Sequence, residues 1–214
     1  MLKAVNLCPN DAVIFGIVVV RGLRVGPSCA EQEAELRSLV ESGRGDSSPE
    51  IKAAVRRMLK KGGFSPNGRN RPSSEYLLKV ASAGEFPEIN NAVDVINYFS
   101  LMWGIPVSLL DLDVVGDRIE LRIASAGEGY VFNRSGQILN LSGLVAVYGD
   151  GYPLGAPVKD SMAGKITDST RNAVAVIYAP SERIDRLTVD GYCRDLAKKM
   201  RKYAKATETA VFIL

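Results

Sequence analysis

Residues 85–113 limit the fold more than any other part of the chain, because they predict one internal helix with both ends marked. Asn90 is placed as its N-cap, and Gly104, followed by Pro106, ends it. Between these caps the helix is apolar on most sides, through Val93, Val95, Ile96, Phe99, Leu101 and Met102. A helix of this composition packs inside a protein rather than on its surface.

One polar stripe interrupts this apolar helix. Asn90, Asp94 and Asn97 are spaced i, i+4, i+7 and therefore share one face. Such a stripe indicates a helix that lines a polar cavity. The alternative is that the three side chains cap the helix and bind a neighbouring loop, and their spacing fits both interpretations equally.

The same segment resembles a known family. It is similar to the motif NN-x-VD-x-x-N-Y-x-x-x-x-x-G-x-P-x-x-x-x-DLD of the editing domain, called B3/B4, in the beta subunit of phenylalanyl-tRNA synthetase. The matching residues are Asn90, Asn91, Val93, Asp94, Asn97, Tyr98, Gly104, Pro106, Asp111, Leu112 and Asp113. A weaker resemblance continues through residues 118–179 and takes in most of the chain after Lys60. The resemblance to this family implies an activity, the hydrolysis of the ester that joins a wrong amino acid to tRNA.

The resemblance also assigns individual positions. Asn97 matches the motif asparagine beside the bound amino acid, and Ile96 stands where the synthetase often has threonine. Ser108 stands where it has its editing histidine, and the strand around Val176 stands where a glutamate reads the substrate side chain. These departures remove the obvious general base, so no residue is predicted to be catalytic. A positioned water, backbone amides and a ribose hydroxyl of the tRNA remain available for the reaction.

Composition narrows the class of protein. The chain has 214 residues, long enough for one sizeable core, and 27 basic against 24 acidic residues, too small an excess to imply nucleic acid by itself. It has no histidine, which removes histidine-based catalysis and most zinc sites. No metal site and no cofactor are predicted. The three cysteines are widely spaced, which predicts reduced thiols in a cytoplasmic protein. The first apolar run, residues 12–20, is too short to span a membrane, and it predicts a buried strand.

The order of patterns predicts the fold class. Helical patterns come first, and period-two alternation follows from Arg118 onward. A final helix is expected over residues 182–205, with a closing strand after it. This order predicts an α+β protein with an antiparallel or mixed central sheet flanked by helices. We expect one B3/B4-like domain over residues 1–214, with its motif core at about residues 60–180.

A glycine-rich segment, residues 149–165, is the expected partner of the helix. Its glycines allow a ligand to approach the backbone, and Lys159 and Ser161 share one face if the segment is extended. The alternative is a turn with an ordinary ion pair. The predicted pocket consists of Asn90, Asp94, Asn97, Ser108, Gly155, Lys159, Asp160, Ser161 and Val176.

A second predicted surface would contact RNA. The turn-rich loop of residues 62–72 carries Arg69 and Arg71, and the helix before it ends in Lys60 and Lys61. Guanidinium groups bind phosphates bidentately, and few acids lie near this loop in the sequence. The alternative is a solvated basic face.

Together with these two surfaces, the resemblance implies a freestanding editing-like protein that binds the acceptor end of tRNA and hydrolyses the ester of a mischarged aminoacyl-tRNA in trans. The alternative is a tRNA- or RNA-binding module that kept the fold without the chemistry. A third interpretation is a pocket that takes a free amino acid or its ester.

The pocket walls would set the choice of amino acid. If Ile96 and the strand of residues 174–176 form them, the pocket is apolar and offers a side-chain hydroxyl no partner. An unpaired buried hydroxyl costs about 1–3 kcal/mol, so an apolar amino acid should be preferred over tyrosine. Val176→Glu would then shift that preference toward hydroxylated side chains.

Overall fold

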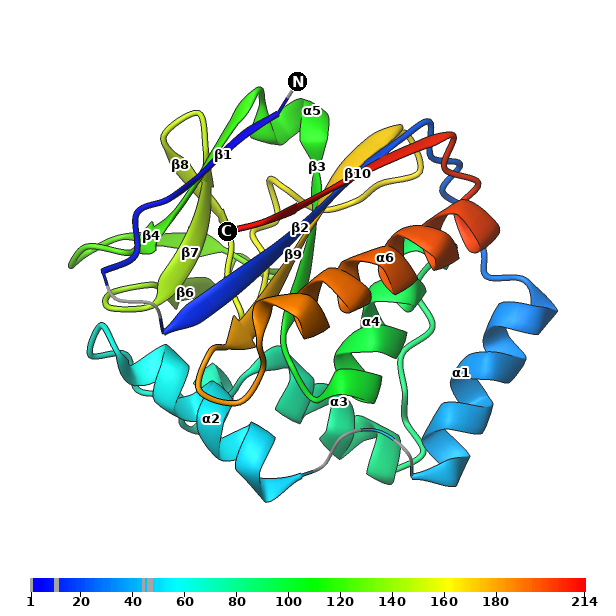
Figure 1. Cartoon of the computed structure of the whole chain (residues 1–214), viewed down its shortest axis with the longest axis horizontal. Coiled ribbons are helices and arrows are strands. Elements are labelled where there is room, and N and C mark those ends of the chain that lie inside the picture. The colour runs from blue at the N-terminus through cyan, green and yellow to red at the C-terminus, as the bar shows by residue number, and fades with distance from the viewer. Residues whose placement is uncertain (1, 10–11, 44, 46–47) are drawn as a thin grey trace.

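The computed structural model describes residues 2–9, 12–43, 45 and 48–214 (Figure 1). The helices are α1 (Ala30–Ser42), α2 (Pro49–Lys60), the short 3₁₀ helix η1 (Gly68–Asn70), α3 (Ser73–Ser82), α4 (Asn91–Trp103), α5 (Leu112–Val115) and α6 (Arg186–Tyr203). The strands are β1 (Lys3–Asn6), β2 (Val13–Arg21), β3 (Val107–Asp111), β4 (Arg118–Ile123), β5 (Gly129–Val131), β6 (Ile138–Asn140), β7 (Val145–Gly149), β8 (Tyr152–Gly155), β9 (Asn172–Pro180) and β10 (Glu208–Ile213).

The main sheet has the strand order β10-β2-β9-β3 and is antiparallel throughout. Its two central strands, β2 and β9, pair over nine residues from Val13↔Pro180 to Arg21↔Asn172. Both are rich in valine and isoleucine and almost fully buried, as expected for strands covered on both faces. β3 is an edge strand of this sheet, and the candidate site lies beside it.

A second sheet has the order β1-β4-β7-β8, with β1 and β4 parallel and the other pairs antiparallel. β5 and β6 form a separate hairpin. Helices and antiparallel or mixed sheets therefore occur together, which confirms the predicted α+β class.

The main sheet lies between helices and the second sheet. On one face α6 crosses β2 and β10, with α4 beside it (Figure 1). Gly16 of β2 permits this close packing, because a Cβ there would lie 2.5 Å from the Cys193 sulfur of α6. On the other face, a Cβ at Gly155 of β8 would lie 3.0 Å from the Leu110 side chain of β3. Alternate side chains of β3 and β9 therefore enter different layers.

The motif helix α4 has the predicted ends. The Asn90 Oδ1 accepts hydrogen bonds from the backbone N–H groups of Ala92 and Val93, at 3.1 and 2.9 Å. Gly104 ends the helix with φ of 69°, in the left-handed region that favours glycine. Inside α4, Phe99 stacks on Trp103 with ring centroids 4.3 Å apart, so the helix is fixed to the core.

Two other helices also begin at residues whose side chains cap them. The run Ser48-Pro49-Glu50 predicts a helix start from the sequence alone, and Ser48 does cap α2, with Pro49 in the first turn and a hydrogen bond from the Ile51 N–H. The last helix begins at Arg186 rather than at residue 182, because the Asp185 side chain accepts from the Thr188 N–H and fixes the start there.

Cys8, Cys29 and Cys193 are all free thiols. Within the described ranges, we find no helix with the length and apolar character needed to cross a membrane.

Candidate substrate-binding site

A cavity of about 540 Å³, called the inner cavity here, lies between α4, β3 and the loop that follows β8. Its apolar lining comes mainly from Val93, Ile96, Val107, Leu109 and Ile166. Its polar lining comes from Ser73, Asn97, Asn133, Lys159, Asp160 and Lys165, with Tyr76, Ile89, Phe132 and Ala156 completing it. The lining of the cavity is therefore partly apolar and partly polar and charged.

β3 forms the apolar wall of the cavity with every second side chain, because successive side chains of a strand point to opposite faces. Val107 and Leu109 line the cavity, and Ser108 between them points to the opposite face of the sheet. There the Ser108 hydroxyl lies 2.9 Å from the hydroxyl of Tyr178, a neighbour on β9. Ile96, one position before Asn97 on α4, closes the same wall from the helix side.

Asp160 lies where the loop meets the free edge of β3. Its Oδ1 accepts from the Ser108 hydroxyl at 2.6 Å and from the Ala156 N–H at 3.3 Å, and its Oδ2 accepts from the Leu109 N–H at 3.3 Å. Burial raises the pKa of Asp160 to about 6, and these hydrogen bonds limit the rise. The carboxyl group is thus fixed in direction and titrates near neutral pH.

Two lysines line the cavity beside this carboxyl group. The Lys159 ammonium donates to the Arg69 carbonyl at 3.2 Å and lies 4.0 Å from the centroid of the Phe132 ring. Burial lowers its pKa, and the nearby Arg69 charge acts in the same direction. Lys165 donates to the Phe132 carbonyl at 2.7 Å. Both positive charges are therefore held at fixed points of the cavity lining.

A second hollow of about 580 Å³, called the outer groove here, adjoins the inner cavity. The two share Ser73, Tyr76, Ile89, Asn97 and Lys159. The rest of the outer groove is lined by Gly68, Arg69, Arg71, Leu77, Lys79, Pro87 and Val158. A ligand that spans both hollows would pass these shared side chains.

The structure brings together three of the nine predicted pocket residues. Asn97, Lys159 and Asp160 all line the inner cavity, although Asn97 lies 62 positions before Lys159 in the sequence. The amide of Asn97 is half-buried and belongs to both hollows, which gives it access to a ligand in either.

Asn90 and Asp94, which share the predicted stripe with Asn97, have structural contacts instead. Asn90 caps α4, and Asp94 accepts from the Ser28 hydroxyl at 2.7 Å and from the Ile89 N–H at 3.0 Å. Burial raises the pKa of Asp94. The stripe thus combines both interpretations, since two members fix loops and the third lines the cavity.

Four other predicted residues lie behind or beside the cavity. Ser108 supports Asp160 from the far face of β3, and the Ser161 hydroxyl accepts from the Ala163 N–H. Gly155 lies close enough to Asp160 that a Cβ there would be 3.1 Å from its Oδ1. Val176 is fully buried and pairs with Ser108 across the strands, so it faces the second sheet.

The predicted wall of residues 174–176 is therefore replaced by β3. The register of the sheet places Val176 beside Ser108, on the side away from the cavity, while Ile96 does line it. With Val176 in the core, Val176→Glu would not place a carboxylate where a substrate binds.

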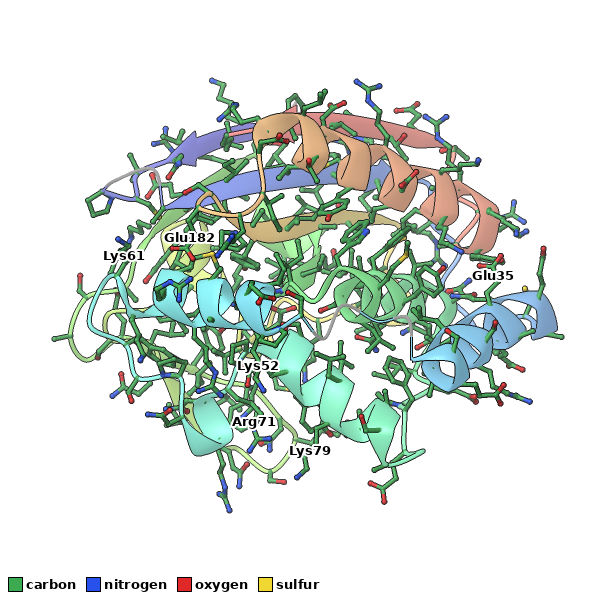
Figure 2. The ribbon with its side chains drawn as sticks, turned by 60° about the horizontal axis from the view of Figure 1, so that its bottom comes forward. Glu35, Lys52, Lys61, Arg71, Lys79 and Glu182 are labelled. Atoms are coloured by element: carbon green, nitrogen blue, oxygen red, sulfur yellow. The ribbon has the colours of Figure 1, made fainter. Side chains whose placement is uncertain are left out.

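The predicted RNA-binding residues divide into two groups. Arg69 and Arg71 line the outer groove, where the Arg71 Nε donates to the Gly68 carbonyl at 2.9 Å. Lys60 and Lys61 lie at the end of α2, and Lys61 lines a different, smaller hollow beside Pro180. Figure 2 shows Lys61 well apart from Arg71, so the loop and the helix end do not form one patch.

The lining residues that were not predicted include Tyr76, Lys79 and Lys165. Tyr76 and Lys79 are spaced i, i+3 on α3, directly after the loop that carries Arg71. That spacing puts them on one face of the helix, and it is the signal in the sequence that could have indicated them.

Comparison with known proteins places the chain in a family. The family model described as the B3/4 domain matches residues 57–195, which contain α3, α4, β3 and the loop with Asp160. The chain therefore belongs to the B3/4 domain family, as the sequence motif predicted.

One relative is the phenylalanine–tRNA ligase beta subunit of Latilactobacillus sakei subsp. sakei (strain 23K), 34% identical over 118 residues. That match covers 52% of this chain and 14% of the relative. A solved structure, an N-terminal fragment of the phenylalanyl-tRNA synthetase beta-subunit from Pyrococcus horikoshii, is 10% identical with a TM-score of 0.49. The superposition covers 99% of this chain and 53% of that one.

Proposed function

We propose that this protein binds the aminoacylated 3′ end of a tRNA and hydrolyses the ester that joins a wrong amino acid to it, acting in trans in the cytoplasm. The observation that carries the proposal is the junction of two hollows, one lined by the carboxyl group of Asp160 and the other by four cations. Membership of the B3/4 family and the tRNA-ligase relative support the same substrate class.

The inner cavity would take the amino acid. Its volume of about 540 Å³ lies within the range of small-molecule sites, and its lining combines the apolar Ile96, Val107 and Leu109 with polar side chains. Asn97 at the junction offers both a donor and an acceptor to the α-amino and carbonyl groups of an aminoacyl ester.

Asp160 would act as the general base. Its Oδ2 accepts from a single N–H, so it has capacity for a second donor such as a water molecule. The water passes its proton to Asp160 while its oxygen adds to the ester carbonyl carbon. The bond from that carbon to the ribose oxygen then breaks, and the ribose oxygen takes the proton back from Asp160, which restores the carboxylate. The positive charges of Lys159 and Lys165 stabilise the oxyanion formed on the way.

The test follows hydrolysis of a mischarged aminoacyl-tRNA between pH 5 and pH 8, with spontaneous hydrolysis subtracted. Because the pKa of Asp160 is about 6, the carboxylate that can take a proton is lost as pH falls through 6. The catalysed rate should therefore rise about tenfold per pH unit below 6 and level off above it.

Asp160→Asn should lower the rate at pH 7 about 10²–10⁴-fold and remove the inflection near pH 6. Asp168→Asn, on the exposed loop before β9, is the matched control and should change neither. An Asp160→Asn protein that folds and keeps the wild-type rate and pH profile would remove Asp160 from the mechanism.

A further inference from the structure

The outer groove has a half-exposed aromatic side chain at its junction with the inner cavity. Tyr76 is 53% exposed, although it lines both hollows. It follows Ser73 and precedes Lys79 at intervals of three on α3, so the three side chains share the helix face turned to the groove. A large aromatic ring between two hollows is suited to stacking against a flat ligand.

The charge of the outer groove indicates what that ligand carries. The described residues that line it include four cations, Arg69, Arg71, Lys79 and Lys159, and no acid. Figure 2 shows Arg71 and Lys79 close together beside α3, at the bottom of the view. The hydrogen bonds from Arg71 to Gly68 and from Lys159 to Arg69 fix two of the four side chains. This is a surface for phosphate groups.

We propose that the outer groove holds the unpaired nucleotides at the 3′ end of the tRNA, with the terminal base stacked on Tyr76 and its phosphates against Arg71 and Lys79. The inference rests on the proposed function, since the amino acid is attached to the ribose of the terminal nucleotide. When the amino acid occupies the inner cavity, that base must lie one ribose away. Tyr76 lines both hollows and is therefore at the required place.

The geometry also defines the kind of recognition. Stacking on an aromatic ring contributes about 1–3 kcal/mol per base and accepts any base, because every base has a flat face. The cations add a part of the affinity that falls as salt rises. The groove should therefore require a single-stranded end and should bind it without a long paired stem.

The experiment measures binding of the trinucleotide CCA, and of the same trinucleotide lacking its terminal base, by titration calorimetry. Tyr76→Ala should weaken binding of CCA about 5- to 100-fold, and Tyr76→Phe, which keeps the ring, should bind like wild type. The wild-type protein should bind the probe that lacks the terminal base more weakly than CCA, by a similar factor. The Tyr76→Ala protein should bind the two probes with equal affinity. Lys79→Ala should weaken binding of both probes and reduce its salt dependence by about one phosphate contact.

Tyr152→Ala is the matched control, because Tyr152 is 72% exposed on β8 and lies outside the residues that line either hollow. It should bind CCA like wild type. If Tyr76→Ala binds CCA as tightly as wild type does, the stacking site is overturned. Hydrolysis of mischarged tRNA is measured with the same proteins. If hydrolysis occurs but CCA binding does not depend on Tyr76, only the stacking site is refuted. If CCA binding depends on Tyr76 but no hydrolysis occurs, only the deacylase is refuted.

Discussion

Val176→Glu is expected to lower the free energy of unfolding by about 3–5 kcal/mol, the range for an unpaired buried charge. Val176 is fully buried in β9, between β2 and β3, and faces the layer filled by Phe15 and Tyr178. A glutamate there would replace apolar contacts with a carboxyl group that has no cationic partner. Urea unfolding followed by circular dichroism measures the change.

The matched control is Val131→Glu, at a strand position that is 39% exposed. There the carboxylate stays hydrated, so the free energy of unfolding should change by about 0.5 kcal/mol or less. If Val176→Glu is as stable as Val131→Glu, then the face assigned to Val176, and with it the assignment of β3 as the cavity wall, is incorrect.

Asn91→Ala is expected to destabilise the protein by about 3 kcal/mol, since an unsatisfied buried polar group costs about 1–3 kcal/mol. The Asn91 side chain donates to the carbonyls of Arg24 and Tyr203, at 2.9 and 3.1 Å, and accepts from the Gly26 N–H at 3.1 Å. Alanine would leave all three backbone groups without this partner. Thermal and urea unfolding of the variant measure the loss.

Asn90→Ala separates this effect from ordinary capping. It removes an N-cap at the neighbouring position and should cost about 1 kcal/mol. Asn91 joins the start of α4 to residues 24–26 and to Tyr203. If the two variants lose equal free energy of unfolding, these bonds do not add to stability and Asn91 acts only at the start of α4.

The parts of the fold that the sequence predicted are those with local causes. Asn90 and Gly104 mark the ends of α4, and Ser48 with Pro49 marks the start of α2, because caps act within a few residues of the helix end. Period-two alternation likewise identifies a strand such as β4 from its own residues.

The parts of the site that the sequence did not predict depend on pairing between distant segments. Ser108 and Val176 looked available to a ligand, but the register of β3 and β9 turns both toward the core. Asn97 and Asp160 were predicted to share a pocket only through the family resemblance, because a bond from the edge of β3 to the loop after β8 brings them together and no local pattern encodes it. Tyr76 becomes prominent only once α3 is placed between the two hollows.

The most direct test of the proposed function uses the pure protein and a panel of mischarged aminoacyl-tRNAs, with the ester followed by acid precipitation of labelled amino acid. We expect hydrolysis of at least one member to exceed the spontaneous rate by tenfold or more, and to fall on Asp160→Asn. Tight, salt-sensitive binding of tRNA with no acceleration for any member would contradict the deacylase and leave a tRNA-binding protein.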